Sequence, residues 1–247
     1  MLKDTPCRLL GRGIVMLTTV PRDNTMISVI IMLKYDAVLF DLDGTLSESA
    51  PGIRKSIEMT LTELGRPIPD LSDYTKYVGP PLDRTLTGMC GMSMEEAMAA
   101  LPIYRRNYDI YGTPSNRLFD GLTEVLTELR AKGVKLAVCT SKNERLAGRV
   151  TDSLGVTDHM DAICGSRDDG GRKDKNELIP YALHRLGDVS ADRAVMVGDT
   201  WFDTVGAVQS GVDFVGVLYG YGTRQSMEDS GATVFAETPD ELLDLLL

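Results

Sequence analysis

The chain has 247 residues, of which 43% are hydrophobic and 25% are charged, as in an ordinary soluble globular protein. This length suffices for one large core that carries a smaller inserted unit. The 36 acidic residues outnumber the 26 basic ones, and the formal net charge is −10. We therefore expect neither a nucleic acid polymer nor a membrane as partner, because both are bound by surfaces rich in Lys and Arg.

The amino-terminal segment shows no clear hydrophobic periodicity over residues 1–31. We expect residues 1–32 to form a poorly ordered extension, and Met32 is a candidate natural start. The apolar run from Ile27 to Leu33 is far shorter than the ~20 residues that span a bilayer, and no small-residue cleavage site follows it. The segment therefore predicts neither a transmembrane helix nor a signal peptide.

The four cysteines are scattered and form no CxxC pair. Cys139 and Cys164 fall in expected strands, where a free cysteine behaves as a small buried hydrophobe. Such usage is typical of the reducing cytoplasm, so we expect a cytoplasmic protein.

From Tyr35 onward, short apolar segments alternate with amphipathic helical patterns. Strands are expected at 36–41, 134–139, 161–164, 193–198, 213–217 and 233–235. Helices are expected at 121–132, 143–154 and 176–186, followed by a last helix that opens with Thr238, Pro239 and Glu241 as a capping box. This alternation predicts an α/β fold with a doubly wound, mostly parallel, Rossmann-like sheet and right-handed crossovers.

One stretch, residues 48–117, interrupts the alternation with helical spacing and no strand. A capping box at Ser93 and Glu96 begins its second helix, which Pro102 is expected to kink or end. We expect an all-helical cap at 48–117, inserted between two parts of the core at 33–47 and 118–247. Such an insert would lie as a lid over the carboxyl ends of the strands.

Two carboxylates follow the first of these strands. Asp41 and Asp43 come directly after the apolar run Ala37-Val38-Leu39-Phe40, and Gly44 then permits a sharp turn. Residues two apart in an extended chain share one side, so both carboxylates can address one small group. Ligands of open α/β sheets bind at this end of the strands.

Three further signals lie at strand ends or helix starts. Thr140 and Ser141 close the second strand of the core with hydroxyls, which can bind a phosphoryl oxygen at a helix entrance. A charged run from Arg172 to Glu177 offers an ammonium group ahead of a helix. The apolar strand that ends in Gly198 is followed by Asp199 and Asp203, whose carboxylates suit Mg²⁺. Each signal is weak alone, and the four in sequence order are strong.

This set of motifs resembles the haloacid dehalogenase (HAD) superfamily of phosphohydrolases over residues 33–247. The resemblance implies that Asp41 is the nucleophile that becomes an aspartyl phosphate, and that Asp43 is the general acid and base. It further implies that a bound Mg²⁺ contacts Asp41, the backbone carbonyl of Asp43 and Asp199, with Asp203 supporting the metal shell. Thr140, Ser141 and Lys175 are implied to hold the phosphoryl group.

Within the superfamily, the chain resembles the phosphoglycolate phosphatase and 5′-nucleotidase-like branch. The segment Val78-Gly79-Pro80-Pro81-Leu82 matches that branch in the cap, and the resemblance implies that Gly79, Pro80, Pro81 and Arg84 help to choose the substrate. The segments 118–121 and 219–222 match its later loops. The lysine motif departs from the common Lys-Pro form: alignment favours Lys175, and Lys173 remains an alternative.

Attack of a carboxylate on a phosphate ester requires positive charge beside the reacting groups. A carboxylate that attacks a phosphate dianion meets like charge, and each pair of unit charges ~4 Å apart costs ~4 kcal/mol at an effective dielectric of ~20. Mg²⁺ and one lysine would offset that repulsion.

We therefore expect a Mg²⁺-dependent phosphomonoesterase that acts on a small phosphorylated metabolite, as a monomer or homodimer. A phosphosugar mutase of the same fold is the main alternative, and a phospho-receiver module is a second. A receiver needs neither Asp43 as an acid nor a lid, so the sequence favours turnover. Trp201, within the third motif, is expected to pack locally rather than to stack on a nucleotide base.

Overall fold

The computed structural model describes residues 15–22 and 25–247. Its centre is a six-stranded sheet in which all paired strands are parallel, in the order β10-β9-β8-β3-β6-β7. The strands are β3 (Ala37–Phe40), β6 (Lys135–Asn143), β7 (Ala162–Ser166), β8 (Ala194–Gly198), β9 (Asp213–Val217) and β10 (Phe235–Ala236). The expected doubly wound sheet is thus confirmed, and the strand order reverses at β3, where such sheets bind their ligands.

Successive side chains of β3 point to opposite faces of the sheet, and each face has its own apolar cluster. Val38 and Phe40 pack in the larger apolar cluster, which also contains α4 (Leu122–Ala131), α5 (Glu144–Leu154) and α9 (Pro239–Leu246). Ala37 and Leu39 point the other way, toward α6 (Lys175–Arg185) and α7 (Trp201–Ser210). Because both faces are covered, β3 is apolar at every position and fully buried.

Helix ends follow the sequence signals with one difference. Gly155 ends α5 in the left-handed conformation, with a φ of +71°. Thr238 accepts a hydrogen bond from the Glu241 amide at the start of α9, but the Glu241 carboxylate accepts from the Glu237 amide instead of closing a capping box on Thr238. A short helix α8 (Arg224–Glu228) lies between β9 and β10.

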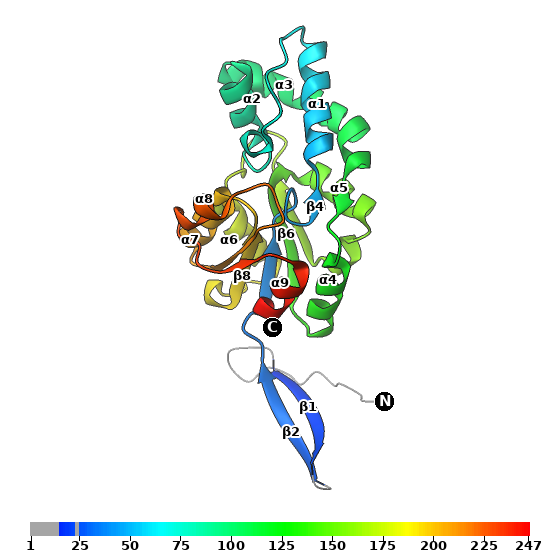
Figure 1. Ribbon diagram of the computed structural model, residues 1–247, viewed down its shortest axis with the longest axis vertical. Coiled ribbons are helices and arrows are strands. Elements are labelled where there is room, and N and C mark those ends of the chain that lie inside the picture. Colours follow the sequence, from blue (N-terminus) through cyan, green and yellow to red (C-terminus); the bar gives the residue numbers. More distant parts are fainter. Residues whose placement is uncertain (1–14, 23–24) are drawn as a thin grey trace.

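The insert forms a helical cap above the sheet (Figure 1). It contains α1 (Ala50–Glu63), η1 (Tyr74–Lys76), α2 (Leu82–Cys90), α3 (Met94–Asn107), η2 (Tyr108–Gly112) and η3 (Thr113–Ser115). Its two connections to the core pair as short antiparallel strands, β4 (Ser47–Glu48) and β5 (Arg117–Leu118). The sequence pattern missed this pairing, because two-residue strands carry no periodicity.

The expected capping box at Ser93 and Glu96 opens α3. The prediction for Pro102 is wrong about an end at that residue, since α3 continues to Asn107 and passes into the π-helical turn η2. A proline removes one backbone hydrogen bond, and packing of the buried face of α3, including Ala100 and Tyr104, compensates.

The sequence predicts a poorly ordered extension at residues 1–32, and the described part of that segment has regular secondary structure. β1 (Val15–Arg22) and β2 (Thr25–Met32) form an antiparallel hairpin whose strands pair only with each other. Segments rich in Val, Ile and Thr favour extended backbone even where apolar and polar residues do not alternate strictly. The hairpin projects from the end of the core opposite the cap (Figure 1). The remainder of the expected extension, residues 1–14, lies outside the described residues.

Of the helices in the described part of the chain, none is both long enough and apolar enough to cross a membrane.

Removal of residues 1–32 should leave the core intact, because the hairpin joins no strand of the six-stranded sheet. We expect a chain that begins at Leu33 to unfold within about 2 °C of the full-length protein in thermal denaturation. A loss of 10 °C or more would show that the hairpin stabilises the core.

Candidate active site

The turn after β3 brings two carboxylates to the cavity between core and cap. Asp41 extends the pairing of β3 with β8, since its amide donates to the Val197 carbonyl at 2.9 Å. Asp41 and Asp43 are both buried and both line the cavity. Gly44 has a φ of +87°, and a Cβ there would lie 2.2 Å from Oδ2 of Asp199. This turn therefore requires glycine.

The loop between β8 and α7 adds two more carboxylates. Asp199 is fully buried and accepts hydrogen bonds from the Thr45 hydroxyl at 3.2 Å and from the Tyr221 amide at 2.8 Å. Asp203 lies in the first turn of α7, where its Oδ2 accepts from the Thr200 amide at 3.1 Å and hydroxyl at 2.8 Å. This capping box fixes Asp203 and leaves its Oδ1 for another partner.

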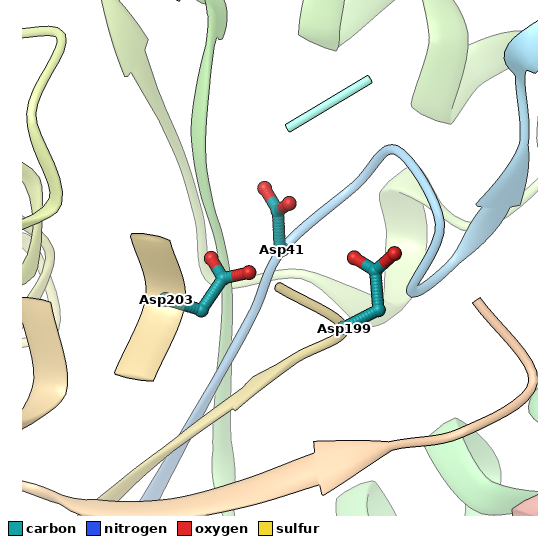
Figure 2. Close-up of side chains that lie close together, drawn as sticks. All are labelled: Asp41, Asp199 and Asp203. Carbon is teal, nitrogen blue, oxygen red and sulfur yellow. The ribbon is translucent and has the colours of Figure 1, made fainter. Parts of the chain in front are cut away.

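Asp41, Asp199 and Asp203 converge where the carboxyl ends of β3 and β8 meet (Figure 2). One oxygen from each lies within 4.8 Å of the others. Such a buried group of carboxylates fits a hard divalent cation, which prefers oxygen ligands. The sequence prediction that these residues come together is met by the structure.

Lys175, the first residue of α6, is buried beside this cluster. Its Nζ lies 2.9 Å from Oδ1 of Asp41 and 2.6 Å from Oδ1 of Asp203, and it donates to the Cys139 carbonyl at 2.7 Å. Close packing of α6 on α7 allows this reach, because a Cβ on Gly206 would lie 2.1 Å from the Lys175 Cβ. One ammonium thus bridges two of the three carboxylates.

Burial dominates the electrostatics of the cluster. Burial raises the pKa of Asp41 to about 6, while Lys175 lowers it and Asp203 raises it. Burial, reinforced by Asp203 and Asp41, also raises the pKa of Asp199 well above its usual value. Burial alone would lower the pKa of Lys175, but the two neighbouring carboxylates raise it, so this lysine stays charged. The site therefore favours added positive charge.

The two predicted hydroxyl residues lie at the far end of β6, which continues beyond the expected strand end at residue 139. Thr140 and Ser141 line the same cavity as Asp41. The Thr140 hydroxyl accepts from the Lys142 amide at 3.2 Å, and the Ser141 hydroxyl donates to the Lys173 carbonyl at 2.8 Å.

The geometry separates the two candidate lysines. Lys173 forms an ion pair with Asp83 at the start of α2 in the cap, whereas Lys175 contacts Asp41. Arg84, the next residue of α2, lies 2.9 Å from Asp174. Two ion pairs therefore join the cap to the segment just before Lys175, one with its acid in the cap and the other with its base there.

The expected specificity residues in the cap occupy different positions. Gly79, Pro80 and Pro81 line the cavity, and a Cβ on Gly79, whose φ is +101°, would lie 2.9 Å from Cγ2 of Thr200. Arg84 does not line the cavity and faces Asp174 instead. Trp201 is also outside the cavity lining; it is 44% exposed and stacks on its neighbour Phe202.

Sequence reasoning missed Lys142. Its Nζ contacts both carboxylate oxygens of Asp43, at 2.8 and 2.5 Å, and lies 4.3 Å from the centre of the Tyr108 ring. The one sequence signal was its position directly after Thr140 and Ser141. That signal could not show that the side chain turns toward Asp43, because β6 shifts register against β7 between Cys139 and Asn143.

Comparison with known proteins finds a matching family and several similar proteins. Residues 38–217 match the family described as haloacid dehalogenase-like hydrolase. The tyrosine-protein kinase PtkA of Mycobacterium tuberculosis is 42% identical over 212 residues, which cover 85% of this chain and 72% of PtkA. A 5′-nucleotidase of Pseudomonas aeruginosa is 37% identical over 195 residues, covering 79% and 88% of the two chains.

Two further similar proteins are described as phosphatases. A phosphoglycolate phosphatase of Thiobacillus denitrificans is 31% identical over 195 residues, covering 76% of this chain and 86% of the relative. The crystal structure of a protein described as a predicted phosphatase from Clostridium acetobutylicum superposes with a TM-score of 0.81 at 34% identity, covering 85% and 97% of the chains.

The family match spans more than half of the chain and includes Asp41, Lys175 and Asp199. The resemblance to the phosphoglycolate phosphatase and 5′-nucleotidase-like branch is confirmed by relatives that carry these names. The chain therefore belongs to the haloacid dehalogenase-like hydrolase family, as an enzyme of the phosphatase type.

Proposed function

We propose that this enzyme is a Mg²⁺-dependent phosphomonoesterase that hydrolyses a small phosphorylated metabolite through an aspartyl phosphate on Asp41. One observation carries the proposal: the Asp41 carboxylate lies in a buried group with Lys175, Asp199 and Asp203 at the end of β3. The Asp41 carboxylate is suited to attack phosphorus once cations offset the repulsion between it, the other two carboxylates and the phosphate. Lys175 is one such cation.

The reaction follows in two steps. A carboxylate oxygen of Asp41 attacks phosphorus, the bond between phosphorus and the ester oxygen breaks, and Asp43 gives its proton to the departing oxygen. Asp43 then takes a proton from water, whose oxygen attacks phosphorus as the bond to Asp41 breaks. Splitting hydrolysis in this way lowers the barrier of each step, and one residue serves as acid and then as base.

Asp41, Asp199 and the backbone carbonyl of Asp43 would hold Mg²⁺, and Asp203 would support them. Burial and the neighbouring carboxylates raise the pKa values of Asp41 and Asp199, and a divalent cation among them would favour the ionised carboxylates, which supports this assignment. When bound, the ion supplies charge neutralisation between the attacking carboxylate and the phosphoryl oxygens.

Lys175 and Thr140 are the proposed contacts to the transferred phosphoryl group, with Ser141 beside them. Lys175 bridges Asp41 and Asp203, so it lies within reach of any group that Asp41 attacks. Because the Ser141 hydroxyl already donates to the Lys173 carbonyl, we assign Ser141 a contact through its backbone amide.

The substrate is proposed to be small, because Gly79, Pro80 and Pro81 of the cap line the same cavity as Asp41 and Asp43. Arg84 is proposed to help choose it indirectly, by fixing the closed cap through Asp174. One chain supplies the complete set of site residues, so a monomer or a homodimer would be active. We place the reaction in the cytoplasm, with support from the free thiols of Cys90, Cys139 and Cys164.

Two other phosphoryl-transfer functions can be separated by experiment. A phosphosugar mutase would return the phosphoryl group to a sugar, and a protein kinase, the activity in the name of the PtkA relative, would pass it to tyrosine. Free phosphate release from a panel of phosphate esters, measured beside isomer formation and peptide phosphorylation, tests the proposal. Dominant transfer to either organic acceptor would contradict it.

Substitution of the nucleophile should abolish turnover without unfolding the protein. We expect Asp41→Asn to lower kcat by at least about 10³-fold, since the amide has nearly the same shape but is a poor nucleophile. Phosphate release and the melting temperature should be measured together. Retention of full activity would remove the assignment.

Substitution of the two lysines should change different kinetic parameters and by different amounts. We expect Lys175→Ala to lower kcat about 100-fold or more, because the ammonium offsets charge at the reacting group. Lys173→Ala should instead raise KM by about tenfold or less and largely spare kcat, because Lys173 pairs with Asp83 of the cap. Steady-state kinetics of both variants decide, and a larger kcat loss at Lys173 would reverse the assignment.

Mg²⁺ binding should weaken in acid. Protons compete with the metal for Asp41, whose pKa burial raises to about 6, so the ion binds best above that pH. We expect Mg²⁺ to raise the melting temperature more at pH 7.5 than at pH 5.5, and excess EDTA to stop phosphate release. Undiminished rates in the chelator would contradict the metal role.

A further inference from the structure

Lys142 is a partly buried cation in the cavity that the proposed mechanism does not use. Its side chain is 7% exposed, and its Nζ contacts both oxygens of Asp43 at 2.8 and 2.5 Å. Within the described part of the chain, the Asp43 carboxylate has no other side-chain partner. The direction in which this carboxylate points therefore depends on Lys142.

Lys142 is in turn held by an aromatic ring from the cap. Its Nζ lies 4.3 Å from the centre of the Tyr108 ring, close enough for a cation–π interaction. Tyr108 is fully buried at the start of η2, and a Cβ on Gly112 would lie 2.3 Å from the ring. The ring is thus packed closely against the backbone of Gly112, one turn later.

The Tyr108 ring is tied to both connections between cap and core. Its hydroxyl accepts from Nδ2 of Asn116 at 3.0 Å, just before β5. Oδ1 of Asn116 accepts from the Ser47 hydroxyl in β4 at 2.7 Å. Because Tyr108 belongs to η2 of the cap and Lys142 to β6 of the core, a movement of the cap relative to the core would change the distance between the ring and the ammonium.

We propose that Lys142 is a positioning residue that holds Asp43 for its acid–base step, and that Tyr108 makes this hold depend on closure of the cap. This inference rests on the proposed function, in which Asp43 protonates the departing oxygen. With the cap closed, the ammonium contacts the Asp43 carboxylate and the aromatic ring together, and one Asp43 oxygen still accepts from the ammonium while the other carries the proton to be donated. With the cap open, the lysine loses the ring and can turn to water, which releases Asp43.

The test is the dependence of rate on the leaving group, because a poor leaving group needs the acid and a good one does not. Phenyl phosphate and 4-nitrophenyl phosphate have similar shape and differ in this respect. With the full-length protein and Mg²⁺, we compare kcat/KM, which reports the steps up to departure of the leaving group. We expect Lys142→Met to lower kcat/KM for phenyl phosphate about tenfold to 100-fold, and for 4-nitrophenyl phosphate by about threefold or less. Asp43→Asn provides the reference pattern.

Two variants keep the test independent of folding defects. Lys142→Arg retains the charge, and we expect it to recover most of the rate for phenyl phosphate. Tyr108→Leu should show the same leaving-group pattern in weaker form, and adding it to Lys142→Met should cause no further loss, because both changes act on one contact. Melting temperatures of all variants show whether any of them is unfolded.

Equal losses on both esters in Lys142→Met, with the selective pattern retained in Asp43→Asn, would overturn the role of Lys142 alone. Independent, multiplying losses in the double variant would overturn the link to the cap. Equal losses in Asp43→Asn itself, or no phosphate release by the unsubstituted enzyme, would contradict the proposed function and this inference with it.

Discussion

Like charge crowded into a small buried volume is the constraint on which the rest of this structure depends. Asp41, Asp199 and Asp203 place oxygens within 4.8 Å of one another, away from water that could screen them. Lys175 offsets part of this charge, while burial and the neighbouring carboxylates keep the pKa values of Asp41 and Asp199 raised. A divalent ion is the natural complement of such a site.

The fold supplies each of these charges from an element that is itself fixed. Asp41 ends a fully buried strand, Asp203 caps α7, and Lys175 opens α6 against a glycine of α7. Burial that makes the charges costly also makes them rigid, because no member can move without losing its partners. The cap adds a second layer in which Asp83 and Arg84 contact the residues just before Lys175.

Much of the sheet and the acidic cluster could be predicted because strong local signals encode them. An apolar run followed by Asp-x-Asp-Gly, or by Gly-Asp, indicates both a strand and the carboxyl end at which its ligands bind. Lys142 could not be predicted in this way, since its role depends on a register shift in β6 and on Tyr108, 34 positions earlier. The same holds for Arg84, whose partner Asp174 lies in another part of the chain.

The most direct test of the account is to trap the phosphoryl site with beryllium fluoride and Mg²⁺ and to solve the structure of the complex. The account predicts a fluoroberyllate bonded to a carboxylate oxygen of Asp41, with the Lys175 ammonium and the Thr140 hydroxyl in contact with its fluorines. An adduct on any other residue, or an adduct that forms equally well without a divalent ion, would contradict the central claim.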